Sequence, residues 1–413
     1  MSNWVKDKIG NVSDSFAGGT PSRSRPDYFN GEIPWISSSE VNLPYIDDTK
    51  EKITELGLEN SSAKWIPKNS VLVAMYGATA GVVSKLLINA TSNQAVLALV
   101  PDKDKIDGGF LYYQVKQNKE GILFLAQGSG QPNLSKDLID NYEINFPISV
   151  SEQLQIATIL SKADAVIEKT QAAIAKYKAI KQGMLQDLFT RGIDTSTGKL
   201  RPSYQDAPAL YKESKLGWIP KEWEALTVAD VSENLDGKRI PVKQGDRDKQ
   251  AEIYPYYGAS GIIDLVENFI FDEQLILLGE DGENVISRNL PLAFKVEGKI
   301  WVNNHAHVLK PIKNISTIDF LCEALEAVDY TPIVSGSAQP KITQGHLNKI
   351  LLPIPKIEEQ ESISKRIVAL NQKLQTEQDF LHKQQQIKAG LMNDLLSGKR
   401  KVKSEKLEEE VKN

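Results

Sequence analysis

The sequence predicts an α+β protein: two mixed α/β domains in tandem repeat, together with two long helices. Three observations predict it. Segments recur about 207 residues apart, each copy ends in a long heptad-patterned stretch, and short apolar runs bounded by turn residues occupy much of the remainder. A chain of 413 residues is long enough for two or three folded units.

The repeat is visible in short strings that recur at a nearly constant offset. Gly128–Pro132 (GSGQP) returns 208 residues later as Gly336–Pro340 (GSAQP). After one residue drops out, the pair Glu152 and Gln153 matches Glu359 and Gln360 at an offset of 207. This period is too long for a solenoid and indicates a duplicated domain with the segment that follows it.

The repeated stretches are predicted to be helices of about 40 residues, which is about 60 Å at 1.5 Å per residue. Apolar residues recur at alternating spacings of three and four, and both stretches share one register. Gly192 and Gly398 follow them as stop signals, and Ser149 with Glu152 forms a start signal for the first. The expected seam consists of Leu160, Ile167, Ile174, Met184, Leu188, Ile367, Leu374, Leu381, Leu391 and Leu395. The shared register favours packing of the helices on each other, although each could instead pack on its own domain.

The globular segments contain both strand and helix patterns. Apolar runs at Val71–Met75, Ala95–Val100 and Leu275–Leu278 predict strands, and Phe110–Lys119 and Thr317–Val328 predict helices. The expected organisation is therefore domain 1 at 1–150, helix 1 at 151–191, a linker at 192–214, domain 2 at 215–357, helix 2 at 358–398 and a charged tail at 399–413.

Composition narrows the class of protein. Cys322 is the single cysteine, which excludes an internal disulfide and fits a reducing compartment. The N-terminal residues have no signal-peptide core, and no apolar stretch is long enough to span a membrane, so a cytoplasmic location is expected. The net charge of −5 counts against a simple DNA-binding domain, but it says nothing of how the charges are distributed.

Catalytic motifs are missing from the sequence. There is no P-loop and no Asn-Pro-Pro or Asp-Pro-Pro motif of amino-methyltransferases, and Pro101-Asp102 with the later Gln114-Val115-Lys116 is only a chance-level nuclease pattern. His305 and His307 form a pair that would share one strand face, but no further ligand joins them, so no metal site is expected. The string from Gly279 to Glu283 is expected to be a tight turn because its spacing is not that of a calcium loop.

Several strings resemble the target recognition domains of Type I restriction-modification specificity subunits. In the first half these are Gly18–Ser22 (GGTPS) and Tyr28–Ile36 (YFNGEIPWI); in the second half they are Leu216–Trp223 (LGWIPKEW) and Tyr254–Gly261 (YPYYGASG). The linker Arg191–Asp194 is also characteristic. The ordered strings and two matching helices cover nearly the whole chain, and the second half lacks both strings of the first.

The resemblance implies a sequence-specific DNA-binding subunit without catalytic activity. Each domain would recognise one half of a bipartite double-stranded DNA target, and unlike domains imply an asymmetric target. The helices would form an antiparallel coiled coil that spaces the domains. Two modification (methyltransferase) subunits and two restriction (motor-nuclease) subunits would be partners, and S-adenosylmethionine, ATP and Mg²⁺ would bind to those partners, with no cofactor on this chain. The alternative function is a coiled-coil scaffold or adaptor that binds only protein.

Residues for DNA contact are expected in loops with polar, basic or closely approaching backbone groups. In the first half they are Arg23, Arg25, Ser37, Ser38, Ser39, Glu40, Tyr76 and Thr79. In the second half they are Lys238, Arg239, Tyr257, Ser260, Asn303, Asn304 and His305. Each could instead be an ordinary solvated loop residue.

Overall fold

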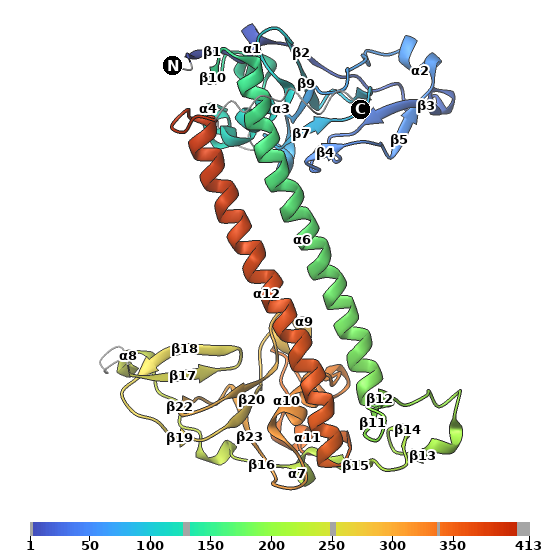
Figure 1. Ribbon diagram of the computed structural model, residues 1–413, viewed down its shortest axis with the longest axis vertical. Coiled ribbons are helices and arrows are strands. Elements are labelled where there is room, and N and C mark those ends of the chain that lie inside the picture. The colour runs from blue at the N-terminus through green and yellow to red at the C-terminus, as the bar shows by residue number, and fades with distance from the viewer. Residues whose placement is uncertain (1–2, 127–132, 248–252, 337–338, 403–413) are drawn as a thin grey trace. The chain divides into compact units, whose positions relative to one another are not determined.

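The computed structural model describes residues 3–126, 133–247, 253–336 and 339–402. The whole of the repeated Gly128–Pro132 string, part of its second copy and the end of the charged tail lie outside these residues. The chain folds as two compact units: unit 1 is Met1–Gln171 with Asp379–Asn413, and unit 2 is Ala172–Gln378. Each unit thus contains one globular part and one half of each long helix (Figure 1).

Unit 1 combines a five-stranded sheet of order β2-β9-β6-β7-β4, a three-stranded sheet of order β5-β3-β8, and the antiparallel pair β1-β10. The strands are β1 (Trp4–Lys8), β2 (Ser13–Ala17), β3 (Phe29–Ile36), β4 (Tyr45–Ile46), β5 (Glu51–Ile53), β6 (Val71–Ala74), β7 (Val83–Leu86), β8 (Thr91–Ser92), β9 (Val96–Pro101) and β10 (Glu143–Pro147). The short helices are α1 (Ile9–Val12), η1 (Pro26–Tyr28), α2 (Glu55–Glu59), η2 (Gly77–Thr79), α3 (Gly108–Gln117), α4 (Lys119–Leu125) and α5 (Lys136–Asp140).

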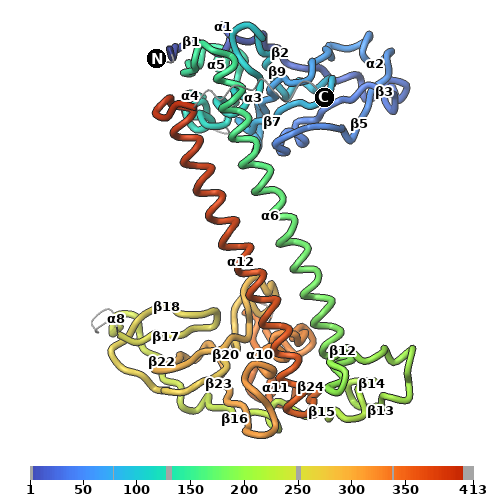
Figure 2. Tube along the Cα trace, in the orientation of Figure 1, coloured from blue at the N-terminus to red at the C-terminus, as the bar shows by residue number. Residues whose placement is uncertain are grey.

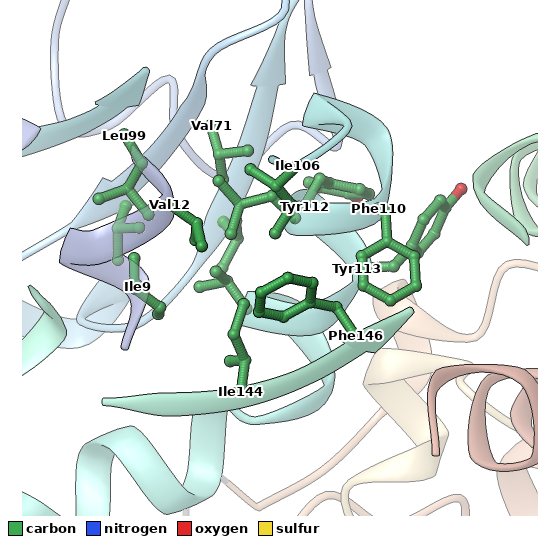
Figure 3. Packing of buried hydrophobic residues seen from close by; sticks show 14 of the residues in the cluster. Ile9, Val12, Val71, Leu99, Ile106, Phe110, Tyr112, Tyr113, Ile144 and Phe146 are labelled. Atoms are coloured by element: carbon green, nitrogen blue, oxygen red, sulfur yellow. The ribbon is translucent and has the colours of Figure 1, made fainter. Parts of the chain in front are cut away.

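The main core of unit 1 lies between its five-stranded sheet and α3. Figure 3 shows Ile9 of α1, Val71 of β6 and Phe110 of α3 in one buried cluster, and all three are fully buried. Side chains from β6 and β9 enter this cluster because alternate residues of a strand point to one face of the sheet. The predicted strands at 71–75 and 95–100 are confirmed, each within one residue.

Unit 2 repeats this plan with sheets β16-β23-β20-β21 and β18-β17-β22-β19 and the pair β15-β24. The strands are β11 (Ile193–Asp194), β12 (Lys199–Leu200), β13 (Tyr211–Ser214), β14 (Gly217–Pro220), β15 (Glu224–Thr227), β16 (Ser232–Asn234), β17 (Tyr254–Gly258), β18 (Gly261–Val266), β19 (Phe271–Asp272), β20 (Leu275–Gly279), β21 (Ala293–Val296), β22 (Lys299–Val302), β23 (Ala306–Pro311) and β24 (Leu351–Ile354). The short helices are η3 (Pro208–Leu210), α7 (Val228–Val231), η4 (Asp236–Lys238), α8 (Gln244–Arg247), α9 (Asn284–Ser287), α10 (Ile318–Glu326), η5 (Thr331–Ile333) and α11 (Gln344–Leu347).

The two long helices are α6 (Val150–Thr190) and α12 (Ile357–Leu396), each an unbroken coil of the Cα trace (Figure 2). Gly192 and Gly398 follow them with φ values of +65° and +72°, the left-handed conformation that glycine adopts most readily after a helix. Each helix therefore ends where the sequence predicts, because no residue with a Cβ atom fits the turn equally well.

Contacts inside each unit show that the helices run antiparallel. In unit 1, Leu160 shares a buried cluster with Leu395, and Asp164 pairs with Lys388. In unit 2, the Lys373 ammonium lies 5.7 Å from the Tyr177 ring centroid, and Leu188 shares a cluster with Ile363. In both units, residues with higher numbers on α6 contact residues with lower numbers on α12, which is the pattern of an antiparallel pair. Of the predicted seam, Leu160, Ile174, Leu188, Ile367, Leu374 and Leu395 are buried, and Ile167, Met184, Leu381 and Leu391 are half-buried.

Two equivalent glutamines, one in each unit, anchor a long helix to the globular part of that unit. The Gln153 side chain donates to the carbonyls of Lys105 and Pro147 at 3.0 and 2.8 Å and accepts from the Asp107 amide at 2.7 Å. Gln360 is fully buried like Gln153 and makes the same three bonds, to Ile315, Pro355 and Thr317. The repeated Glu-Gln pair in the sequence thus marks a repeated structural joint.

The predicted linker at 192–214 is a folded part of unit 2. Its β11-β12 hairpin lies against the start of α12 because Arg201, only 10% exposed, pairs with the buried carboxylate of Glu359. Glu359 also accepts from the Ile193 amide at 2.7 Å and from the Trp223 indole at 3.0 Å. The polar composition of this segment predicted a linker between domains. In the structure, the ion pair of Arg201 with Glu359 holds the segment against α12.

Candidate nucleic-acid interface

In unit 1, the loops that follow β3, β6 and β8 meet at one end of the sheets. The Met75 amide donates to the Ala95 carbonyl at 2.9 Å, and the Asn93 amide donates to the Ile36 carbonyl at 2.9 Å. These bonds join the end of β6 to the start of β9 and the end of β8 to the end of β3. Loop residues that are distant in the sequence are consequently neighbours here.

Unit 2 has the same two bonds at the corresponding places. The Glu280 amide donates to the His305 carbonyl at 2.8 Å, and the Asn303 amide donates to the Tyr257 carbonyl at 3.0 Å. Three residues predicted to contact DNA, Tyr257, Asn303 and His305, therefore come from one continuous loop cluster.

The strand ladders reveal an equivalence between the two halves that their sequence strings do not show. Trp35 pairs with Thr91 in a parallel ladder, and Tyr256 pairs with Trp301 in the same type of ladder. Strand β3, with its IPWI string, and strand β17, with its YPYY string, are therefore the same element of the repeat. The second half lacks the string, as its sequence shows, but it has the corresponding strand with different side chains.

In unit 1, both arginines that were predicted to contact DNA form ion pairs with carboxylates. Arg23 donates to Glu51 at 2.5 and 3.1 Å and lies 4.6 Å from the Phe29 ring centroid. Arg25 donates to Asp27 at 2.6 and 2.9 Å. The hydrogen bonds with Glu51 raise the pKa of Arg23 above its usual value. Both guanidinium groups are more than half exposed, and such exposed ion pairs contribute little stability, so another anion can replace the carboxylates.

The serine-rich loop after β3 is organised by Glu40. Its carboxylate, only 5% exposed, accepts from the Ser37 amide at 3.0 Å, the Ser37 hydroxyl at 2.8 Å and the Lys50 amide at 2.9 Å. Ser38 is half-buried and Ser39 is exposed at the outside of this loop. Nearby, Tyr76 is 44% exposed and Thr79 is half-buried in η2.

The second interface has a mixed rim of exposed polar side chains. Lys238, Ser260 and Asn304 are exposed, and Ser260 lies in the two-residue turn between β17 and β18. The His305 ring is about half exposed, with Nδ1 2.9 Å from Asp281. Tyr257 is half-buried, and burial raises the pKa of its hydroxyl.

Three residues predicted to contact DNA instead have their side chains inside the protein. Glu40 holds its own loop, Asn303 is 5% exposed and accepts from the His305 amide at 2.8 Å, and Arg239 donates to Glu280 at 2.6 Å and to the Ala306 carbonyl at 2.8 Å. Their polar atoms are satisfied by protein groups, so a role in shaping the loops fits them better than direct base contact. The other predicted contacts stay predictions.

The predicted set omitted exposed groups at equivalent places. Asn93 corresponds to Asn303, since each accepts a hydrogen bond from the amide two residues later, so Gln94 occupies the place of Asn304. The Gln94 side chain accepts from the Thr20 hydroxyl at 2.5 Å. In unit 2, Lys341 reaches the same cluster and is about half exposed. The signal for Gln94 was present in the sequence as an Asn-Gln pair before β9 and an Asn-Asn pair before β23.

Two further properties concern the described part of the chain. Among these residues no cluster of three or more His, Cys, Asp or Glu side chains is suited to hold a metal ion. None of the helices there is both long and apolar enough to cross a membrane.

A duplicated α+β fold with antiparallel helices and two matching loop clusters defines a class of DNA-specificity proteins. The chain belongs to the type I restriction modification DNA specificity domain family, whose model matches residues 1–177 and again residues 220–389.

Relatives cover almost the full length of the chain. The MjaVIII specificity subunit of a type I restriction enzyme from Methanocaldococcus jannaschii is 23% identical, over 97% of this chain and 94% of its own. The EcoprrI specificity subunit from Escherichia coli is 23% identical over 86% and 83% of the two chains. The crystal structure of a type I restriction-modification S subunit from M. genitalium covers 95% of this chain and 96% of its own, with a TM-score of 0.64 and 20% identity, which shows a common fold.

Proposed function

We propose that this chain recognises an asymmetric, bipartite DNA sequence for a type I restriction-modification complex, with one loop cluster on each half-site. The observation that carries the proposal is the pair of loop clusters. Their main-chain bonds are the same, while their side chains differ. One cluster has the half-buried Ser38 and the exposed Ser39 and Gln94, and the other has the exposed Asn304 and His305. Serine, asparagine and glutamine form hydrogen bonds with base edges, so different sets select different bases.

The family supports the partners that we propose. Relatives are named specificity subunits of type I restriction enzymes, and a subunit of that kind works beside others that modify and cleave DNA. We therefore assign two methyltransferase subunits and two motor-nuclease subunits as partners, with S-adenosylmethionine, ATP and Mg²⁺ bound to them. Positive charge from these partners would also compensate for the net charge of −5, because phosphate contacts supply much of the affinity for DNA.

The chain itself is proposed to be non-catalytic. The purified chain is expected to transfer no methyl group from S-adenosylmethionine, cleave no DNA and hydrolyse no ATP. Methylation by the pure chain, abolished by a substitution within it, would contradict this assignment.

The decisive experiment maps methylated sites by sequencing, using the full chain assembled with its methyltransferase subunit. The Ser38→Ala/Ser39→Ala variant changes the first loop cluster, and Asn304→Ala/His305→Ala changes the second, so each is the matched control for the other. Each variant is expected to relax the preferred bases in one half-site only, since one good base contact contributes about 1–3 kcal/mol of discrimination.

The same data test the scaffold alternative. If the wild-type complex selects no DNA sequence, the chain is an adaptor between proteins and the proposal fails. If either variant changes both half-sites together, recognition is not divided between the units.

A further inference from the structure

A buried histidine lies beneath the second loop cluster with acceptors on both sides. His307 of β23 is fully buried; its Nδ1 lies 2.6 Å from a carboxylate oxygen of Asp236, and its Nε2 lies 2.8 Å from the Ile342 carbonyl. A carbonyl oxygen only accepts hydrogen bonds, so Nε2 must carry a proton. An ionised carboxylate also only accepts, so Nδ1 carries one as well, and the ring is a buried imidazolium.

Charged side chains extend this contact into a network. Arg239 donates to Glu280 at 2.6 Å and lies 3.5 Å from Asp236, while Lys341 lies 2.9 Å from Glu280. The Nδ1 atom of His307 is also 3.9 Å from Glu280. At the rim, Asp281 holds His305 at 2.9 Å. We call Asp236, Arg239, Glu280, His307 and Lys341 the charged floor.

The ionised state of both carboxylates fits this arrangement. Burial by itself would raise the pKa of Asp236, but the hydrogen bond and charge of His307, the Val308 amide and Arg239 lower it below its usual value. Burial likewise opposes ionisation of Glu280, and Lys341, Arg239 and His307 together lower its pKa. With His307 as an imidazolium, the floor has three positive and two negative charges, so its net charge is positive beneath a surface that must approach phosphates.

The charged floor joins the loops of the second interface. Asp236 and Arg239 belong to the segment with Lys238, Glu280 precedes Asp281, and His307 follows Asn304 and His305. Asp236 also accepts from the Val308 amide at 2.8 Å, and the Ile342 amide donates to the Glu280 carbonyl at 2.8 Å. Displacing one member would therefore shift several loops that present side chains to DNA.

Unit 1 has an apolar floor at the same place. The strand pairings of β2, β6 and β9 in unit 1 align with those of β16, β20 and β23 in unit 2. In this alignment Leu97, Met75 and Ala17 of unit 1 occupy the positions of His307, Glu280 and Asp236 in unit 2. Leu97 and Met75 are buried, and Ala17 packs against their cluster. The fold thus forms this loop cluster without charges, so the network in unit 2 is not required by the fold alone.

We propose that the charged floor, with His307 as an imidazolium, is a positioning device that sets the base preference of the second half-site only. None of its buried members is assigned a base contact; His307 acts through the loops that it joins. The inference rests on the proposed function, because it presupposes that the second loop cluster recognises DNA.

The test uses the full chain with its methyltransferase subunit and maps methylated sites by sequencing. His307→Leu leaves the Asp236 carboxylate buried without its partner and can prevent folding. The second variant therefore introduces the three apolar residues of unit 1, as Asp236→Ala/Glu280→Met/His307→Leu. In this variant Arg239 keeps its hydrogen bonds to the main-chain carbonyls of residue 236 and Ala306, and Lys341 is about half exposed to water. Ser84→Ala, a buried residue of unit 1, serves as a control for non-specific destabilisation.

The triple variant is expected to fold and bind DNA, but to lose about tenfold or more of its discrimination at one or more bases of the second half-site, comparable to one mismatched base pair. First half-site preferences should be unchanged.

Two results would overturn the inference while leaving the proposed function intact. One is a folded triple variant with wild-type base preferences at both half-sites. The other is an equal loss at both half-sites, which would mean that the network affects general stability. If the wild-type complex shows no second half-site at all, the proposed function itself fails.

Discussion

Replacing Glu359 should destabilise unit 2 far more than replacing its repeat counterpart Glu152 destabilises unit 1. Glu359 is 2% exposed and accepts hydrogen bonds from Arg201, the Ile193 amide and the Trp223 indole. Glu359→Ala leaves the Arg201 charge buried without a partner, and breaking such a pair costs about 3–5 kcal/mol. Glu152 is half-buried, and no side-chain hydrogen bond or ion pair joins it to the residues that the structure describes. Glu152→Ala should therefore cost within about 0.5 kcal/mol.

The chain contains its own probe for this measurement. Cys322 is the single cysteine, lies in the core of unit 2, and burial raises the pKa of its thiol to about 12. A thiol reagent thus reacts only when unit 2 opens. A loss of about 4 kcal/mol raises the open population, and with it the labelling rate, roughly a thousandfold, because 1.4 kcal/mol is a factor of ten. The midpoint of thermal unfolding of unit 2 should fall by roughly 8–16 °C.

The interpretation would be refuted if Glu359→Ala labelled Cys322 no faster than the wild type. It would be refuted equally if Glu152→Ala and Glu359→Ala lowered thermal stability by the same amount. Either result would mean that Arg201 and the hairpin do not hold the start of α12.

Three further predictions follow from the described contacts. Gln153→Ala and Gln360→Ala should each cost about 3 kcal/mol in urea unfolding, because each leaves three buried main-chain groups without partners; a cost below about 1 kcal/mol would show that water replaces them. Since the folded pKa values of Asp236 and Glu280 are lowered, their stabilisation should be complete above about pH 5 and disappear as pH falls through those values, and the apolar triple variant should lose less stability in acid than the wild type. Inserting seven residues after both Ile174 and Leu381 keeps the heptad seam and adds about 10 Å to the helices, so methylation should keep both half-sites with a gap longer by about three base pairs; sites with the original gap would contradict a spacer role.

The long helices and the main strands could be predicted closely from the sequence. The predicted helix at 151–191 is α6 at Val150–Thr190, because a heptad pattern and a following glycine each have one dominant structural solution. Strand β6 was visible since a run of four buried apolar residues between turn signals favours a central strand.

The interface residues were harder to predict, because loop composition does not show which polar side chain faces inward. Arg239 and Lys238 are adjacent in the sequence, but one is bound to Glu280 and the other is exposed. The equivalence of β3 and β17 was also hidden. It appears only in the parallel ladders, since the two strands share the Pro residue but few other side chains.

The two units share their contacts to the long helices but differ in the buried residues beneath their loop clusters. The joints to the long helices are the same down to single hydrogen bonds, at Gln153 and Gln360, because both helices must leave their globular parts in the same way. The floors of the two loop clusters differ completely, apolar around Leu97 and charged around His307. A change in the floor moves loops without touching the joint. If the proposed function holds, this separation would let one fold support two unlike recognition surfaces in a single chain, with determinants of half-site preference beneath the loops as well as on their exposed side chains.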